Sequence, residues 1–165
     1  MKGFIGARQT TLANEVSLTG TGVHSGAPVS LTLCPADSDT GIRFLICNGE
    51  IDGVEIVADQ QCVSGVTLCT ILSDGNGASI ATVEHVLAAL RGLSVDNALI
   101  EIDSGEVPIM DGSAAPFVEA IDEAGIAELQ APRRYLKVLK PIRVEENGAV
   151  GELNPYNGFH LDIEI

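Results

Sequence analysis

The segment SIATVEHVLAALRGL, residues 79–93, marks the point where the spacing of apolar side chains along this chain changes. From about Ala81 onward, apolar residues recur every three or four positions, which is the period of an amphipathic helix. These residues are Val83, Val86, Leu87, Leu90 and Leu93. We therefore predict a helix from Thr82 to Gly92, with Gly92 near its end as the cap.

The residues before this helix alternate between apolar and polar or small side chains, as half-buried strands do. Two such runs are Val29, Leu31 and Leu33, and then Ile42, Phe44 and Ile46. Turn sequences follow at Asn48-Gly49, Asp52-Gly53 and Asp74-Gly75-Asn76-Gly77. Because Asn-Gly and Asp-Gly favour tight hairpin turns, we predict small antiparallel pieces here, including a strand insertion around residues 47–72.

After the helix, the pattern predicts a strand from Ala98 to Ile102 and a second helix from Ser113 to Gly125. Ser113 would be its N-cap, and Pro116 would lie in the first turn, where a missing N–H costs little. Further strands are expected at Tyr135–Leu139, Ile142–Glu145, Val150–Leu153 and Phe159–Ile165, with a turn at Asn147-Gly148. The last of these alternates up to the final residue, which suggests that the sequence is cut from something longer.

These elements predict an α+β fold in which an antiparallel or mixed sheet carries both helices on one face. The 165 residues fit one ordinary domain, so we expect a single domain over residues 1–165. The chain is 45% hydrophobic and only 19% charged, which is typical of a soluble globular protein rather than a disordered one.

The charge balance argues against nucleic acid and anionic membranes as partners. Nine Lys and Arg residues oppose 23 Asp and Glu residues, giving a net charge of −14. The nearest approach to a basic cluster is Arg133 and Arg134 with Lys137 and Lys140, which we interpret as an exposed strand edge.

The cysteine spacing and the hydropathy of the chain favour a reducing, cytoplasmic location. Cys34, Cys47, Cys62 and Cys69 form no C-x-x-C pair and no dense disulfide framework. The first eight residues contain no apolar signal segment, and no run of about 18 apolar residues predicts an integral membrane segment.

Glu84 and His85 place an acid and an imidazole side by side at the start of the first predicted helix. Imidazole is a common zinc ligand, and a carboxylate beside the metal can take a proton from bound water. On spacing alone, a solvated pair in a first helical turn, which the helix dipole favours, is the more common arrangement. Both interpretations stay open on the residues alone.

Three other segments invite functional interpretations that their patterns support poorly. The glycines of residues 20–26 are spaced G-x-G-x-x-x-G with no helix opening after them, so a tight turn containing His24 is favoured over a dinucleotide loop. Asp111 and Ser113 are interpreted as a turn and a helix N-cap. Cys69 has no nearby cation, which favours a buried structural thiol over a nucleophile.

Taken together, several blocks resemble the N-terminal half of the UDP-3-O-acyl-N-acetylglucosamine deacetylases. The blocks are TGVHSG (21–26), LCT (68–70), TVEH (82–85), PIMDGSAAPF (108–117) and NPYNGF (154–159), and they occur in order along essentially the whole chain. The resemblance implies a zinc-dependent amidase that removes acetate from UDP-3-O-(3-hydroxyacyl)-N-acetylglucosamine. That reaction belongs to lipid A, and hence lipopolysaccharide, synthesis in Gram-negative bacteria.

The resemblance also implies residue roles and a missing partner. His85 would be one zinc ligand and Glu84 the general base, Leu68 and Cys69 would line the passage near the metal, and His24 would lie close to the site. Similar ligands also suit Fe²⁺. In the family, two further ligands come from an H-x-x-x-D motif in a C-terminal domain, and His160 with Asp162 does not match that motif.

Because a catalytic zinc site normally has three protein ligands, we expect this chain alone to have little or no activity. The family packs two such domains as a β-α-α-β sandwich, so an isolated half should expose an apolar patch at Val86, Leu90, Val118 and Ile121 and self-associate. The alternative is a non-catalytic stand-alone half that acts as a protein-binding or regulatory module. A third interpretation is a small acidic binding module with a coincidental Glu-His pair.

Overall fold

The structure is a computed structural model that describes residues 7–47 and 53–164. In chain order its elements are β1 (Arg8–Leu12), β2 (Val16–Thr21), β3 (Pro28–Pro35), β4 (Ile42–Ile46), β5 (Val54–Val57), the 3₁₀ helix η1 (Gln60–Cys62), β6 (Val63–Gly65), β7 (Ile71–Ser73), β8 (Ser79–Ala81), α1 (Glu84–Gly92), β9 (Ala98–Ile102), α2 (Ala115–Ala124), β10 (Ile126–Pro132), β11 (Ile142–Glu146) and β12 (Ala149–Leu153). The chain divides into two compact units, a first unit ending at Arg133 and a second unit beginning at Arg134.

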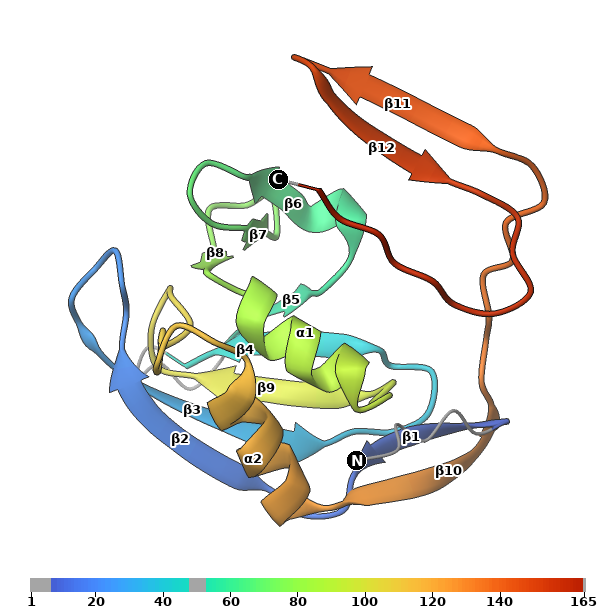
Figure 1. Ribbon diagram of the computed structural model, residues 1–165. Helices are drawn as coiled ribbons and strands as arrows, with labels where there is room; N and C mark the ends of the chain where they lie inside the picture. The colour runs from blue at the N-terminus through green and yellow to red at the C-terminus, as the bar shows by residue number, and fades with distance from the viewer. Residues whose placement is uncertain (1–6, 48–52, 165) are drawn as a thin grey trace. The chain divides into compact units, whose positions relative to one another are not determined.

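A five-stranded mixed sheet forms the framework of the first unit, with strand order β2-β3-β9-β4-β5. The central strand β9 pairs antiparallel with β3 and parallel with β4. The alternating runs of the sequence form β3 and β4, and β9 has the predicted bounds. Helices α1 and α2 lie on one face of this sheet (Figure 1). The predicted α+β class with a mixed sheet is confirmed.

The core lies between this sheet and the two helices. Leu31, Phe44 and Ile100 from the strands and Val86 and Phe117 from the helices are fully buried. Burying a side chain of this size contributes about 1.5–3 kcal/mol. The hydrophobic pattern that predicted the helix therefore identifies the face that covers the sheet.

The predicted apolar patch on the helices is wrong. Val86, Leu90 and Ile121 are at most 1% exposed, and Val118 is half-buried against the same core. Each helix has one apolar stripe, and that stripe already covers the unit's own sheet. These side chains therefore give no reason to expect self-association.

Helix α1 begins two residues later than predicted, at Glu84. Thr82 has a left-handed backbone (φ 61°), which is incompatible with a helical turn, and Val83 is the N-cap. Gly92 is the last helical residue rather than the cap, and Leu93 caps the end through its backbone N–H.

Helix α2 has Ala114 as its N-cap, so the assignment of Ser113 to that position is wrong by one residue. The Ser113 hydroxyl still accepts a hydrogen bond from the N–H of Ala115 at 3.1 Å. Pro116 lies in the first turn and Gly125 ends the helix, as predicted.

A second, three-stranded antiparallel sheet, β6-β7-β8, stands between β5 and α1 in the sequence. The turn at residues 74–77 joins β7 to β8, as its Asp-Gly-Asn-Gly sequence predicts. The predicted turn at Asn48-Gly49 lies outside the described residues, as does Asp52 of the Asp52-Gly53 turn.

The second unit contains the antiparallel hairpin β11–β12, whose turn is the predicted Asn147-Gly148. The strands predicted at Tyr135–Leu139 and Phe159–Ile165 are wrong for the residues described there. Alternation fixes which side chains share a face, but a strand forms only where another strand pairs with its N–H and C=O groups.

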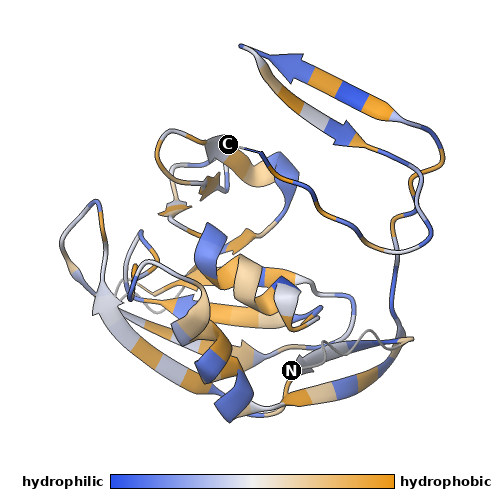
Figure 2. Ribbon diagram, in the orientation of Figure 1, coloured by the Kyte–Doolittle hydropathy of each residue, from blue (hydrophilic) through white to orange (hydrophobic). Residues whose placement is uncertain are grey.

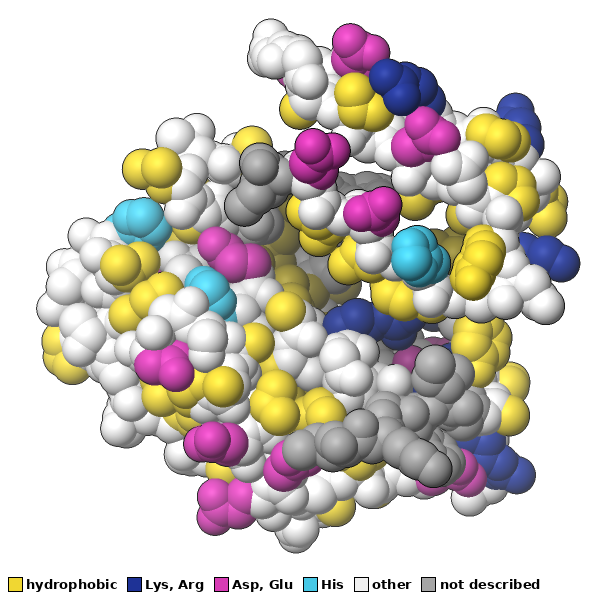
Figure 3. All heavy atoms as spheres, in the orientation of Figure 1, with side chains coloured by type: hydrophobic (Ala, Val, Ile, Leu, Met, Phe, Trp, Pro, Cys, Tyr) yellow, Lys and Arg dark blue, Asp and Glu magenta, His cyan; other side chains and the backbone are white. Residues whose placement is uncertain are grey.

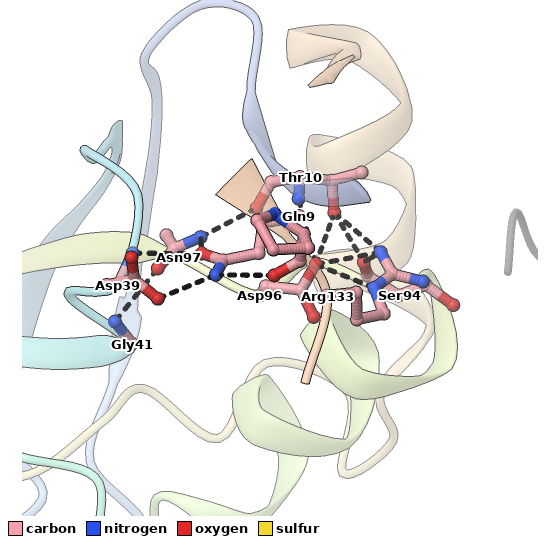
Figure 4. A network of polar contacts seen from close by, with 9 residues as sticks. Gln9, Thr10, Asp39, Gly41, Ser94, Asp96, Asn97 and Arg133 are labelled. Atoms are coloured by element: carbon pink, nitrogen blue, oxygen red, sulfur yellow. Dashed lines mark hydrogen bonds and ion pairs between the residues drawn. The ribbon is translucent and has the colours of Figure 1, made fainter. Parts of the chain in front are cut away.

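A buried polar network fastens β1 and β10 to the loop between α1 and β9 (Figure 4). Arg133 bonds the carboxylate of Asp96 at 2.8 Å and the carbonyl of Ser94 at 2.8 Å. The N–H of Thr10 donates to the same carboxylate at 2.8 Å. Arg133 is 8% exposed, so its placement on an exposed basic strand edge is wrong.

Candidate functional site

The candidate site is centred on the first turn of α1, where Glu84 and His85 are both half-buried. The next residue along, Val86, is fully buried and anchors the turn to the core. The pair therefore sits at the edge of the helix's apolar stripe, neither in the core nor fully in solvent. Neither ring nitrogen of His85 makes a hydrogen bond to another described residue.

The loop between β6 and β7 lies against this turn. The backbone N–H of Thr70 donates to Oε2 of Glu84 at 3.1 Å. Leu68, two residues earlier, is 88% exposed and has a left-handed backbone (φ 63°). Cys69 between them is half-buried rather than buried, and its thiol is free. Glu84 and the 68–70 segment are thus brought together.

His24 lies in the exposed turn between β2 and β3. The N–H of Gly22 donates to the carbonyl of Ala27 at 3.0 Å, and the N–H of Gly26 donates to Gly22 at 2.9 Å. This hydrogen bonding confirms the tight turn favoured over a dinucleotide loop. Figure 3 shows two histidine side chains close to an acidic side chain on one face of the molecule.

Asp111 and Ser113 lie in the segment before α2 and are bonded to each other. The Ser113 hydroxyl and N–H donate to Oδ1 of Asp111 at 2.8 and 2.9 Å. These bonds, with a smaller contribution from the charge of His85, hold the pKa of Asp111 below its ordinary value.

The backbone is strained around the candidate site. Among the described residues, six non-glycine residues have a positive φ, and three of them are Leu68, Thr82 and Met110. Such conformations cost about 1–3 kcal/mol each and persist where the surrounding structure holds them. Leu68 lies two residues before Thr70, whose N–H bonds the Glu84 carboxylate, and Thr82 lies two residues before Glu84 itself.

The described residues do not bring together three His, Cys, Asp or Glu side chains as a metal site would need. Cys34, Cys47, Cys62 and Cys69 are all free. His85 has the chemistry of a single ligand, with both ring nitrogens open to a further partner.

Sequence reasoning missed one residue beside this site, Glu106, which is 5% exposed and bonds the backbone of His24 and Ser25. It follows β9 as an isolated acid in a Gly-Glu-Val sequence. Isolated acids in loops are usually solvated, so no local pattern distinguishes this one. Its burial depends on which segments the fold brings together.

Comparison with known proteins gives a consistent result. Residues 9–165 match the family model described as UDP-3-O-acyl N-acetylglycosamine deacetylase (LpxC). The chain is 47% identical over 158 residues to the UDP-3-O-acyl-N-acetylglucosamine deacetylase of Vibrio cholerae serotype O1, covering 96% of this chain and 52% of that protein. The proteins of the same name from Aliivibrio fischeri and Shewanella halifaxensis are each 46% identical, over 160 and 157 residues.

The matches cover 96% and 95% of this chain for these two proteins but only 52% and 51% of the relatives. The chain therefore spans about half the length of the curated relatives it matches. The resemblance based on the TVEH and PIMDGSAAPF blocks is confirmed across nearly the whole chain. This chain belongs to the UDP-3-O-acyl N-acetylglycosamine deacetylase family.

Proposed function

We propose that this chain is the N-terminal half of a metal-dependent deacetylase acting in lipid A biosynthesis. Its substrate would be a UDP-linked, 3-O-acylated N-acetylglucosamine, whose acetamide bond is hydrolysed. The observation that carries the proposal is the Glu84–His85 pair on the first turn of α1, with the Thr70 N–H on one carboxylate oxygen, in a member of this family.

His85 is the metal ligand in this proposal. Its half-buried ring with hydrogen-bond-free nitrogens suits Zn²⁺, and Fe²⁺ accepts the same ligand. A bound zinc ion would lower the pKa of water and polarise the amide carbonyl. The further ligands would come from the C-terminal domain of the same enzyme, which is the partner that this chain needs.

Glu84 is the general base. Its Oε2 is held by the Thr70 N–H at 3.1 Å, which fixes the carboxylate and leaves Oε1 available to a water molecule. Oε1 would take a proton as that water attacks the acetamide carbonyl. The same oxygen would then donate the proton to the departing amine nitrogen, which restores the carboxylate.

His24, Leu68 and Cys69 are the proposed substrate contacts. Leu68 is an apolar side chain held almost fully in solvent, at 88% exposure, next to the segment that bonds Glu84. Such exposure suits contact with an acyl chain. His24 is an exposed donor on the neighbouring turn and suits a polar part of the substrate.

A stand-alone, non-catalytic half remains the second candidate. It is favoured by the lack of a three-ligand group in the described residues. In that case the chain would bind a partner domain and do no chemistry. The two candidates differ in whether Glu84 and His85 matter once a C-terminal half is supplied.

The test is to pair this chain with a C-terminal half of a relative. We would fuse this chain to the C-terminal half of the Vibrio cholerae deacetylase and measure acetate release and zinc content. The expected result is hydrolysis that falls to background in Glu84→Gln and His85→Gln, with zinc lost only in the latter. Glu119→Gln, which changes an exposed acid on α2, is the matched control.

Three outcomes would contradict the proposal. Full activity in Glu84→Gln would contradict the role of Glu84 as general base, and full activity in His85→Gln would contradict the role of His85 as metal ligand. A fusion that folds and binds zinc but releases no acetate would instead favour the non-catalytic half, and tight binding of the separate halves without hydrolysis would support the same conclusion.

A further inference from the structure

Glu106 is a buried carboxylate that the proposed reaction does not use. It is 5% exposed, and no Lys or Arg among the described residues forms an ion pair with it. An ionised carboxylate in such a place is costly unless donors surround it. The structure supplies those donors entirely from neutral groups.

The donors come from two segments that are far apart in the sequence. The N–H of His24 donates to Oε1 and the N–H of Ser25 donates to Oε2, both at 2.9 Å. The Thr82 hydroxyl donates to Oε1 at 3.3 Å. Gly22 completes the enclosure, because any Cβ there would overlap the carboxylate of Glu106 and the Ser25 hydroxyl.

Glu106 is charged in this environment. Burial raises the pKa of its carboxyl group, but hydrogen bonds from the Ser25 hydroxyl and from the His24 and Ser25 N–H groups outweigh burial and leave the pKa below its ordinary value. A charged carboxylate is acceptor-only, which matches a shell made entirely of donors.

The backbone fixes Glu106 next to the start of α1. The N–H of Ala81 donates to the carbonyl of Gly105 at 2.9 Å, and the N–H of Val107 donates to Ala81 at 3.0 Å. Glu106 is thereby paired with Ala81 at the end of β8, three residues before Glu84. Its side chain then reaches across to the turn that carries His24.

We infer that Glu106 is a positioning residue that holds the His24 turn against the Thr82–Glu84 segment. This inference rests on the proposed function. Glu106 would act through His24 and would not touch the substrate. Its carboxylate accepts the backbone N–H of His24, which is itself an exposed residue. A neutral amide at position 106 would place an N–H donor against one of the backbone N–H donors.

Hydrogen exchange on this chain tests the contact without any enzyme assay. In Glu106→Gln, the amides of His24 and Ser25 should exchange about tenfold faster or more, because one of their acceptors is lost. The matched control is Asp103→Asn, which alters a carboxylate that also accepts a backbone N–H, from Ser30 at 2.8 Å. Unchanged exchange at His24 and Ser25 in Glu106→Gln would overturn the inference.

The fused enzyme tests the consequence through a double-mutant cycle with His24→Gln. We expect Glu106→Gln to lower kcat/KM by about tenfold or more, with zinc content unchanged. We expect the double variant to be no worse than His24→Gln alone, since both changes remove the same positioned imidazole. A residue that only stabilised the fold would instead give additive losses that follow the folded fraction.

The failures are distinguishable. If the unmodified fusion is inactive, the proposed function fails while hydrogen exchange still decides the contact. The positioning role is wrong if the fusion is active and Glu106→Gln has the same kcat/KM as Asp103→Asn. It is also wrong if His24→Gln leaves kcat/KM unchanged. Should Glu106→Gln fail to fold, Ser25→Ala removes one hydroxyl donor from an exposed residue and should give a smaller loss in the same cycle.

Discussion

Strands β9 and β11 are both five residues long and both alternate, yet they differ completely in burial. In β9, Ala98, Ile100 and Ile102 are at most 1% exposed. In β11, every residue is exposed, including Ile142 at 49% and Val144 at 67%. Figure 2 shows the same banding of apolar and polar residues along strands of both units.

The difference lies in what each strand packs against. β9 has strand neighbours on both edges and helices over its sheet, whereas among residues 7–47 and 53–164 β11 pairs with β12 alone. An isolated two-stranded hairpin is marginally stable in water. A hydrophobic pattern therefore specifies which side chains share a face of a strand. That face contributes to the stability of the fold only where another layer of strands or helices packs on it.

The largest expected contrast comes from the same truncation in the two units. Phe117→Ala empties a fully buried site in α2 and should lower the free energy of unfolding of the first unit by about 3–5 kcal/mol. Phe159→Ala removes a side chain that is 83% exposed and should change that free energy by less than about 0.5 kcal/mol. Urea unfolding followed by far-ultraviolet circular dichroism measures both.

Comparable losses from the two substitutions would contradict the contrast between a packed and an unpacked unit. It would mean that Phe159 is buried in solution. Phe44→Ala, which empties another fully buried site, serves as the positive control for the first unit.

The same contrast explains which parts of the fold the sequence predicted. Period predicted β3, β4 and the first helix, each of which has one face in the core, whereas the second helix was predicted from Ser113 and Pro116 at its start. Strands β2 and β5 of the same sheet were not predicted. The strand expected at Phe159–Ile165 was wrong because alternation says nothing about pairing partners. The apolar patch was wrong because the apolar stripe of each helix was assigned to contact with a second domain, whereas it packs on the unit's own sheet.

Only those residues of the candidate site that belong to a local sequence motif could be predicted from the sequence. Glu84 and His85 stand out because an acid and an imidazole open an apolar helix, and family resemblance suggested their roles. The Thr70–Glu84 bond and the buried Glu106 were not predictable, because they join segments 14 to 82 residues apart. Such contacts follow from tertiary structure and leave no spacing signature.

Ion pairs give the second contrast. Arg133→Met leaves Asp96 partly buried without its guanidinium and should cost the first unit about 3 kcal/mol. Arg143→Met in β11 breaks two pairs, to Glu145 at 3.3 Å and Glu152 at 3.2 Å, whose side chains are all at least 41% exposed. It should cost at most about 1 kcal/mol. Raising salt in the same urea titrations should weaken only the Arg143 effect.

Acid sensitivity gives the third contrast. Because the pKa of Glu106 lies below its ordinary value of 4.5, its stabilisation is complete above that value and is lost as pH falls through the lower folded value. Glu106→Gln should therefore cost about 1–3 kcal/mol at neutral pH, and its stability should converge on that of the unmodified chain below pH 4.5. Urea midpoints at several pH values between 7 and 3 measure this.

The hairpin supplies the control for that titration. Glu152 also has a lowered pKa, through hydrogen bonds from Asn154 and Arg143, but the group is solvent-exposed. Glu152→Gln should leave the acid slope of the first unit unchanged. If both substitutions flattened the slope equally, the buried shell around Glu106 would not be the source of the effect.

The smallest contrast concerns two glycines with left-handed backbones. Gly125 ends α2 with φ 75° and ψ 166°, a conformation open almost only to glycine, and its carbonyl accepts the N–H of Ala13 at 2.9 Å. Gly125→Ala should lower the urea midpoint of the first unit by an amount equivalent to about 1 kcal/mol. Gly148→Ala, at φ 84° in the β11–β12 turn, should leave that midpoint unchanged and weaken only the hairpin, seen as lost cross-strand nuclear Overhauser effects. A midpoint shift from Gly148→Ala as large as that from Gly125→Ala would show that the hairpin belongs to the cooperative core, because a local turn penalty reaches global unfolding only through shared packing.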